Sequence, residues 1–284
     1  MNLQNILSEI EQTDPEVYEK LDTRRDAMKS FVKTSGRIAL AAVPFALGSM
    51  FQKAYGSPTG TSDIIIDTLN FALTLEYLES NFYIKAVASG IIPAGVSLTA
   101  LNVIRDHENE HVAFLTTAIK AAGGTPVSFK ATDFDFTAKG TFPGVFTDYG
   151  TLLAVAQTFE DTGVRAYKGQ APNLISNNDY LQAALQIHSV EARHAAHLRE
   201  MRKAANLLVP PGVNVKPWIT LNQSGIASSA VQASYNGEEN VVQAGLTITN
   251  IGGFPISVSA ASEAFDEPLT KDQVTAIVSH FLHR

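Results

Sequence analysis

The strongest constraint on the fold of this chain is a repeated set of acids and histidines in the order E … ExxH … E … ExxH. Its members are Glu76, Glu108, His111, Glu160, Glu191 and His194. The spacing is nearly the same in both halves, with 32 residues from Glu76 to Glu108 and 31 from Glu160 to Glu191. Residues three apart lie on one face of a helix, so each ExxH pair can aim a carboxylate and an imidazole at one point.

This ligand count predicts a dinuclear metal centre. Carboxylate-bridged four-helix bundles hold two ions with two lone Glu residues and two ExxH pairs. We expect the lone residues, Glu76 and Glu160, to reach between the ions as bridging ligands. Four ionised carboxylates would neutralise two divalent cations, whereas the same acids buried without metal would be costly. The alternative interpretation is a set of solvated helix charges that align by chance.

The neighbours of the four acids favour the metal interpretation. Glu108, for example, shares its helical stripe with Leu101, Ile104 and Leu115, and the other three acids also lie on apolar stripes. Polar residues set into an apolar helix face point towards a core. Acids in that position need a partner, and a cation would provide one.

Hydrophobic periodicity and breakers predict an all-α chain with a four-helix bundle. The predicted helices span about residues 62–89, 98–122, 148–168 and 178–208. Residues 123–147 are rich in Gly, Pro, Thr and Phe, and we expect them to form a long crossover that places the second and third helices parallel. The predicted organisation is an N-terminal segment (1–56), the bundle (57–208) and a C-terminal accessory helical region (209–284).

These motifs resemble the ferritin-like superfamily, and more narrowly the bacterial ferritin-like domain proteins related to desiccation-associated proteins. The resemblance covers about residues 62–207 and includes FALTLEYLESNFY (Phe71–Tyr83) and IRDHENEHVAFL (Ile104–Leu115). It implies a ferritin-like bundle in which the six acids and histidines of the repeat are the metal ligands. Tyr83 and Tyr167, each seven residues after a lone Glu, match aromatic positions beside such sites. They are the candidate catalytic residues, as a source of an electron or a hydrogen bond.

Nitrogen and carboxylate ligands suit iron or manganese, while zinc would occupy the site without redox chemistry. The leading hypothesis is a dinuclear oxidoreductase that reduces dioxygen or hydrogen peroxide in stress protection. Two alternatives stay open. One is iron binding and storage with a ferroxidase centre, and the other is a structural desiccation-related protein whose metal site is not catalytic.

Composition limits the partners and cofactors that this chain can have, and the N-terminal segment predicts its cellular location. The net charge of −7 argues against a nucleic-acid partner, and the absence of cysteine excludes disulfides, iron–sulfur clusters and thiolate zinc sites.

The N-terminal segment resembles a twin-arginine export signal. Arg24 and Arg25 precede an apolar run at 38–47 that is too short to span a bilayer. We therefore expect a periplasmic protein without a transmembrane anchor after processing. A cytoplasmic location is the alternative, if the segment is a basic helix. The oligomeric state stays open, with a dimer among the options.

Several polar residues outside the repeat are expected to support the ligands or the helices rather than to bind metal. His107, His188, His197 and Glu79 are candidates for supporting a ligand, and Asp161 is expected to be a solvated acid or a hydrogen-bond acceptor near the site. Glu238 is expected to cap or decorate a helix of the C-terminal region. In LTKDQVTAIVSHFL (Leu269–Leu282), Thr270 and Gln273 suit the capping box of a helix.

Overall fold

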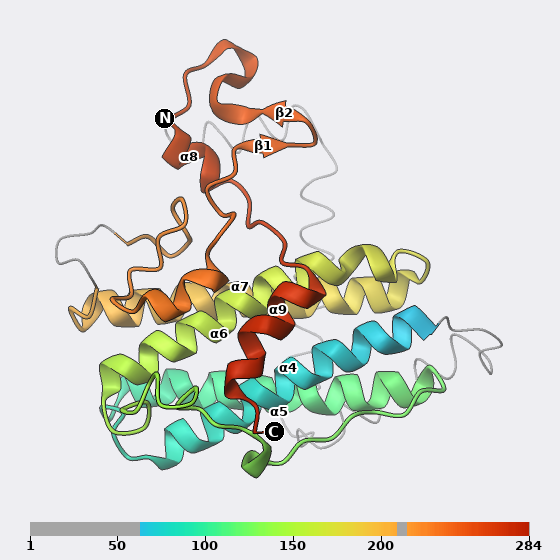
Figure 1. The fold of residues 1–284 in the computed structure, drawn as a ribbon, viewed down its shortest axis with the longest axis vertical. Coiled ribbons are helices and arrows are strands. Elements are labelled where there is room, and N and C mark those ends of the chain that lie inside the picture. Colours follow the sequence, from blue (N-terminus) through green and yellow to red (C-terminus); the bar gives the residue numbers. More distant parts are fainter. Residues whose placement is uncertain (1–62, 209–214, 284) are drawn as a thin grey trace, which may run out of the picture. The chain divides into compact units, whose positions relative to one another are not determined.

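The computed structural model describes residues 63–208 and 215–283, and four long helices dominate this part of the chain (Figure 1). They are α4 (Asp63–Ala88), α5 (Val96–Ala121), α6 (Tyr149–Gln170) and α7 (Asn178–Ala204). The four predicted helices are thus confirmed, with bounds within a few residues of those expected. The segment with Arg24 and Arg25 lies outside the described residues. Among the described helices, none is both long enough and apolar enough to cross a membrane.

Local chemistry sets the helix ends. Asp148 caps α6 by accepting a hydrogen bond from the Thr151 amide, and Asn177 caps α7 by accepting from the amides of the first turn. Just beyond the ends of α4 and α5, Gly90 and Gly123 adopt positive φ angles of 75° and 82°, which suit glycine after a helix. These signals are short-range, so the sequence alone could place the ends.

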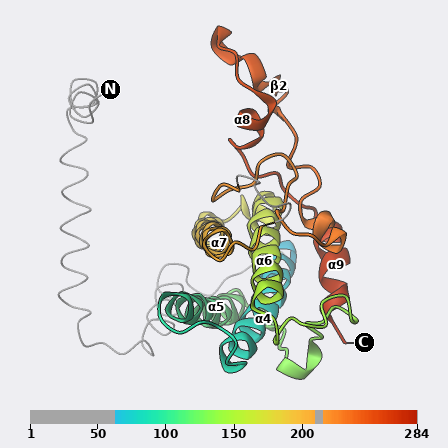
Figure 2. The same ribbon diagram turned by 90° about the vertical axis from the view of Figure 1, so that its left-hand side faces the viewer.

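The four helices form two hairpins that pack on each other. α4 packs along α5 and α6 along α7, while α4 also contacts α6 and α5 contacts α7 (Figures 1 and 2). Two apolar clusters fill the interior. One includes Leu78, Phe82 and Leu152, and the other includes Leu69 and Ile119. Along α4, Glu76 lies between the residues of the two clusters. Apolar side chains therefore pack on both sides of Glu76 along the bundle axis.

The long connection between α5 and α6 lies along α4. The Val127 amide donates to Asn70 Oδ1 at 2.8 Å, and Phe129 packs edge-on against Tyr77. Further along, the rings of Phe136 and Phe146 contact Phe82. The contacts therefore advance along α4 from its first turns towards its C-terminal half. A short 3-10 turn, η2 (Ala131–Asp133), interrupts this segment.

The C-terminal region is less helical than expected. It contains η4 (Ser229–Ser234), a hairpin of β1 (Val242–Gln243) and β2 (Leu246–Thr247), η5 (Ile248–Gly253), α8 (Val258–Ser262), α9 (Lys271–Val278) and η6 (Ser279–Phe281). Only α9 matches the sequence prediction closely, including the capping box of Thr270 and Gln273. Glycines with positive φ at 237, 245 and 252 break the remaining segments into turns, which explains why no longer helix forms.

Arg165 on α6 anchors this region to the bundle. Its guanidinium donates to the backbone carbonyls of Ser234 at 2.7 Å, Asn236 at 2.8 Å and Glu267 at 2.7 Å, and it pairs with Glu238 at 2.7 Å. Glu238 is 1% exposed, so the expectation that it decorates a helix surface is wrong. Burial raises the pKa of Glu238 to about 7, while Arg165 opposes the rise.

A second buried pair lies one turn earlier on α6. Asp161 is paired with Arg199 at 2.5 Å and accepts a hydrogen bond from Tyr235 at 2.7 Å. Asp161 is therefore neither a solvated acid nor directed at the histidines, because the C-terminal region covers it. Arg165 and this pair hold Ser234–Glu238 and Glu267 against α6, whereas Leu246 and Phe254, which lie between these segments, are 61% and 73% exposed.

Arg165→Ala is expected to destabilise the fold by about 3–5 kcal/mol, because it leaves the buried Glu238 carboxylate and three carbonyls without their partner. Chemical denaturation measures the loss, and limited proteolysis should show earlier cleavage in the C-terminal region. Lys203→Ala is the control, since Lys203 pairs with Glu200 at 4.0 Å on the surface. An exposed pair of this kind contributes less than about 1 kcal/mol. Equal effects in both variants would contradict the anchoring role.

Candidate metal centre

All six acids and histidines of the sequence repeat converge at the centre of the bundle. Glu76 comes from α4, Glu108 and His111 from α5, Glu160 from α6, and Glu191 and His194 from α7. The four carboxylates are completely buried, and the two histidines are 9% and 5% exposed. The apolar stripes on which these residues lie explain the convergence, because each helix turns that face inward.

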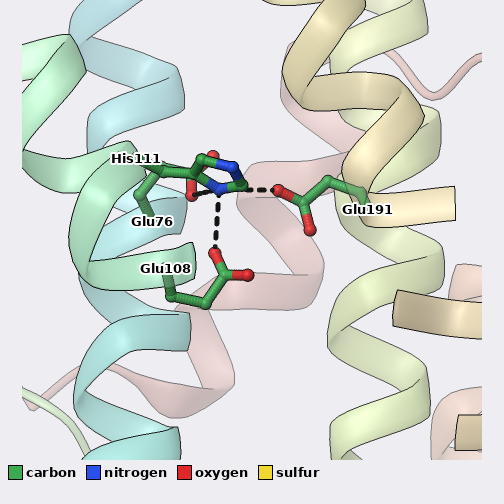
Figure 3. Close-up of side chains that lie close together, drawn as sticks. All are labelled: Glu76, Glu108, His111 and Glu191. Carbon is green, nitrogen blue, oxygen red and sulfur yellow. Dashed lines mark hydrogen bonds and ion pairs between the residues drawn. The ribbon is translucent and has the colours of Figure 1, made fainter. Parts of the chain in front are cut away.

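Three carboxylates surround the His111 imidazole (Figure 3). Its Nδ1 lies 3.0 Å from Glu76 Oε2, 3.2 Å from Glu108 Oε2 and 3.1 Å from Glu191 Oε1. Glu191 reaches this group from the opposite hairpin, so the group joins three helices.

A matching group surrounds His194. Its Nδ1 lies 3.0 Å from Glu108 Oε1, 3.1 Å from Glu160 Oε2 and 3.3 Å from Glu191 Oε2. In each group the potential ligand atoms lie within 4.8 Å of one another. Glu108 and Glu191 belong to both groups, with one oxygen towards each histidine.

This geometry corrects one expectation from the sequence. Glu76 and Glu160 were expected to bridge two ions, but each stands beside one histidine only. The shared positions belong to Glu108 and Glu191, because α5 and α7 meet across the centre and their carboxylates reach the midline. Sequence spacing could not reveal this, since it depends on how the two hairpins face each other.

The two tyrosines make crossed hydrogen bonds between α4 and α6. Tyr167 on α6 donates to Oε1 of Glu76 on α4, and Tyr83 on α4 donates to Oε1 of Glu160 on α6. Both phenols are buried, and burial together with the adjacent carboxylates raises their pKa well above the ordinary value. Each lone Glu is therefore held in place by a neutral phenol from the other hairpin.

The buried carboxylates and imidazoles of the centre shift one another's pKa values. Burial raises the pKa of Glu76 to about 7 and that of Glu160 to about 8, although His111 and His194 oppose these shifts. Burial works to lower the pKa of His194, yet Glu160 and the other carboxylates raise it to about 12. The pKa of His111 is raised for the same reason. Protons on these groups therefore offset part of the negative charge that burial penalises.

The residues present fit a pair of cations. Glu108 Oε1 and both Glu191 oxygens are buried and accept no hydrogen bond within the described part of the chain, although each lies 3.0–3.3 Å from an imidazole Nδ1 that other carboxylates share. An unsatisfied buried acceptor costs about 1–3 kcal/mol, and more if it is charged. Two imidazoles and four carboxylates are also ligands that iron, manganese and zinc accept.

Glu79 is a further acid of the buried cluster, beyond the six residues of the repeat. It lies one turn after Glu76, is 3% exposed, and its pKa is raised well above the ordinary value by burial and by Glu191 and Glu160. The matching residue one turn after Glu160 is Gly163, where an added Cβ would lie 3.3 Å from Glu79 Oε1. The glycine therefore makes room for a fifth buried acid. The signal that could have identified Glu79 is the exchange of Glu79 in the first half of the repeat for Gly163 in the second.

His107 also contributes more than the sequence indicated. Its Nδ1 lies 3.0 Å from His194 Nε2, and the two rings stack at 5.2 Å. Metal-binding imidazoles commonly use their second nitrogen for such a partner. His188 instead contacts the Val164 carbonyl at 2.9 Å, and His197 is exposed.

The fold and the cluster define the class of this protein as a helical bundle with a buried Glu/His site that is compatible with metal binding. The model of the ferritin-like domain family matches residues 65–204, which include nearly all of the four helices. The chain belongs to the ferritin-like superfamily. Neither the curated proteins nor the solved structures compared with it gave a significant match.

Proposed function

We propose that this protein binds two ions of iron or manganese and uses them to reduce dioxygen or hydrogen peroxide. The observation that carries the proposal is the pair of ligand groups that share Glu108 and Glu191. When bound, two such ions supply two electrons by passing from the divalent to the trivalent state. Hydrogen peroxide would take up these electrons and two protons, its O–O bond would break, and two water molecules would leave.

The residues of the chain would have distinct tasks in this reaction. Glu108 and Glu191 would hold the two ions at a fixed separation, and Tyr83 and Tyr167 would orient the terminal carboxylates. Beside Tyr167 lies a cavity of about 20 Å³ whose accessible walls are apolar, lined by residues that include Ala72 and Leu115. A space of this size holds about one water-sized molecule, and apolar cavities stay dry. This supports dioxygen, which is small and apolar, as one of the two proposed oxidants.

We further propose that residues 123–147 are the crossover of a ferritin-like bundle. Their contacts along α4, from Asn70 to Phe82, support a connection that returns along the bundle before α6 begins. The narrower desiccation-related affiliation and a role in stress protection rest on the sequence motifs alone.

Export through the twin-arginine-like segment is also proposed from the sequence. Mass spectrometry of protein from a periplasmic fraction of the native host should find a mature N-terminus after residue 56. An intact N-terminus confined to the cytoplasm would contradict export.

The function is tested by loading metal-free protein with ferrous or manganous ions under anaerobic conditions and then adding each oxidant. We expect two ions per chain, by elemental analysis, and loss of about one peroxide per ion pair in a single turnover. Zinc-loaded protein is the control, because zinc lacks redox chemistry. If the iron and manganese forms leave both oxidants untouched, the non-catalytic alternative holds. If many more ions accumulate in a large shell, by light scattering, the storage alternative holds.

Tyr83→Phe and Tyr167→Phe are expected to leave metal stoichiometry unchanged but to slow oxidation of the bound ions by about 10–100-fold, because each removes a hydrogen bond to a terminal carboxylate. Stopped-flow absorbance after addition of oxidant measures the rate. Tyr77→Phe is the matched control on α4, since Tyr77 packs against Phe129 away from the centre. Wild-type rates in both tyrosine variants would rule out a catalytic role for the phenols.

A further inference from the structure

A second concavity lies on the side of α6 that the C-terminal region covers, and the proposed redox chemistry makes no use of it. It has a volume of about 520 Å³ and is bounded by α6, η4, α9 and the connection before α6. We call it the C-terminal pocket, with Thr141, Phe142, Ser234, Asn236, Gln273 and Ala276 among its lining residues. Figure 2 shows η4 and α9 side by side next to α6. Pockets for small organic ligands span about 300–1,000 Å³, so the size is suitable.

The walls of this pocket are fixed by long-range hydrogen bonds. Arg165 holds η4 through the carbonyls of Ser234 and Asn236, and Thr162 Oγ1 donates to Ser234 Oγ at 2.9 Å. The Asp135 amide donates to the Phe281 carbonyl at 2.8 Å, which ties the connection before α6 to the end of the chain. The pocket is therefore preformed, and a ligand would not have to order it.

The chemistry of the lining is neutral and mixed. None of the residues that line the C-terminal pocket is Asp, Glu, Lys or Arg, and His280 is the one titratable side chain among them. The carbonyl oxygens of two amide side chains are already bound, because Asn236 Oδ1 accepts from Gln232 and Gln273 Oε1 accepts from the Thr270 amide. Their amino groups, and the Thr141 hydroxyl, form no hydrogen bond within the described residues. Phe142 and Phe281, whose rings are parallel, add apolar surface.

We propose that the C-terminal pocket binds a neutral polyhydroxylated molecule of the size of a mono- or disaccharide. Apart from His280, the lining offers a charged ligand no counter-ion, so it favours a ligand that binds through hydrogen bonds rather than through charge. A purely apolar ligand would displace water from the free amino and hydroxyl groups without replacing those hydrogen bonds. A sugar offers acceptor oxygens to Asn236, Gln273 and Thr141, and its C–H face suits the apolar surface. This proposal does not depend on the metal centre.

The test uses saturation-transfer NMR and calorimetry on the whole chain with three probes. These are maltose, glucuronate as a charged sugar, and N-phenyl-1-naphthylamine as an uncharged apolar dye. We expect binding of maltose alone. Ala276→Trp should fill the pocket and weaken maltose binding at least tenfold. Thr275→Trp, next to it on the exposed face of α9 and not among the lining residues, should leave binding unchanged.

Asn236→Leu provides a second variant that removes an amino donor without filling the pocket. Its expected effect is a loss of maltose affinity of about fivefold or more, with metal content unchanged. The proposal is overturned if maltose does not bind. It is also overturned if Ala276→Trp weakens binding of the dye or of glucuronate but not of maltose. Equal maltose binding by the Ala276→Trp and Thr275→Trp variants would overturn it as well. Metal analysis and peroxide assays on the same samples keep this outcome separate from the outcome for the proposed function.

Discussion

Glu108→Ala is expected to lower the metal content of the reconstituted protein from two ions per chain to one or none, and Glu191→Ala should do the same. Each of these residues gives one oxygen to either ligand group, so its removal damages both. Elemental analysis against protein concentration measures the loss. Glu110→Ala on α5 and Glu200→Ala on α7 are matched controls, because both glutamates are exposed on the same helices. Full metal content in the Glu108 and Glu191 variants would refute the assignment.

A graded result distinguishes shared ligands from terminal ones. Glu76→Ala should cost at most one ion, because Glu76 belongs only to the group around His111. The reverse order, with the larger loss in the Glu76 variant, would favour the bridging role that sequence spacing suggested. The comparison therefore tests the arrangement of the hairpins as well as the identity of the ligands.

Removal of the metal is expected to make stability strongly dependent on pH. In the metal-free fold the pKa values of Glu76 and Glu160 are about 7 and 8, against 4.5 for an unburied carboxyl. The folded state then binds protons that the unfolded state has released. This contribution to stability is present in full below about pH 4.5 and is lost as the pH rises through 7 to 8. The raised pKa of His194 acts in the same direction at higher pH.

Thermal unfolding followed by circular dichroism from pH 5 to 9 measures this effect. The Tm of chelator-treated protein should fall across the range, and the loss should be on the order of several kcal/mol, since one pKa unit corresponds to about 1.4 kcal/mol. The Tm of metal-loaded protein should stay level or rise, because ligands must lose protons to bind cations. Parallel curves for the two forms would mean that no cation replaces the protons of the cluster.

The sequence by itself determined the four helices and the six residues of the buried Glu/His cluster. Both depend on contacts between residues three or four apart, so the periodicity of Leu101, Ile104, Glu108 and Leu115 is enough to orient a helix face. The N-cap of α6 and the capping box of α9 are local in the same way. The family match over residues 65–204 agrees with these local signals.

Only the tertiary structure decided which carboxylates are shared, where Glu79 fits and how the C-terminal region is held. The sharing of Glu108 and Glu191 depends on how two hairpins face each other, and the room for Glu79 depends on Gly163 from another helix. The burial of Glu238 depends on Arg165, which is far from it in the sequence. Such long-range pairings leave no periodic signal in the chain, because each is set by the packing of segments that the sequence does not place side by side.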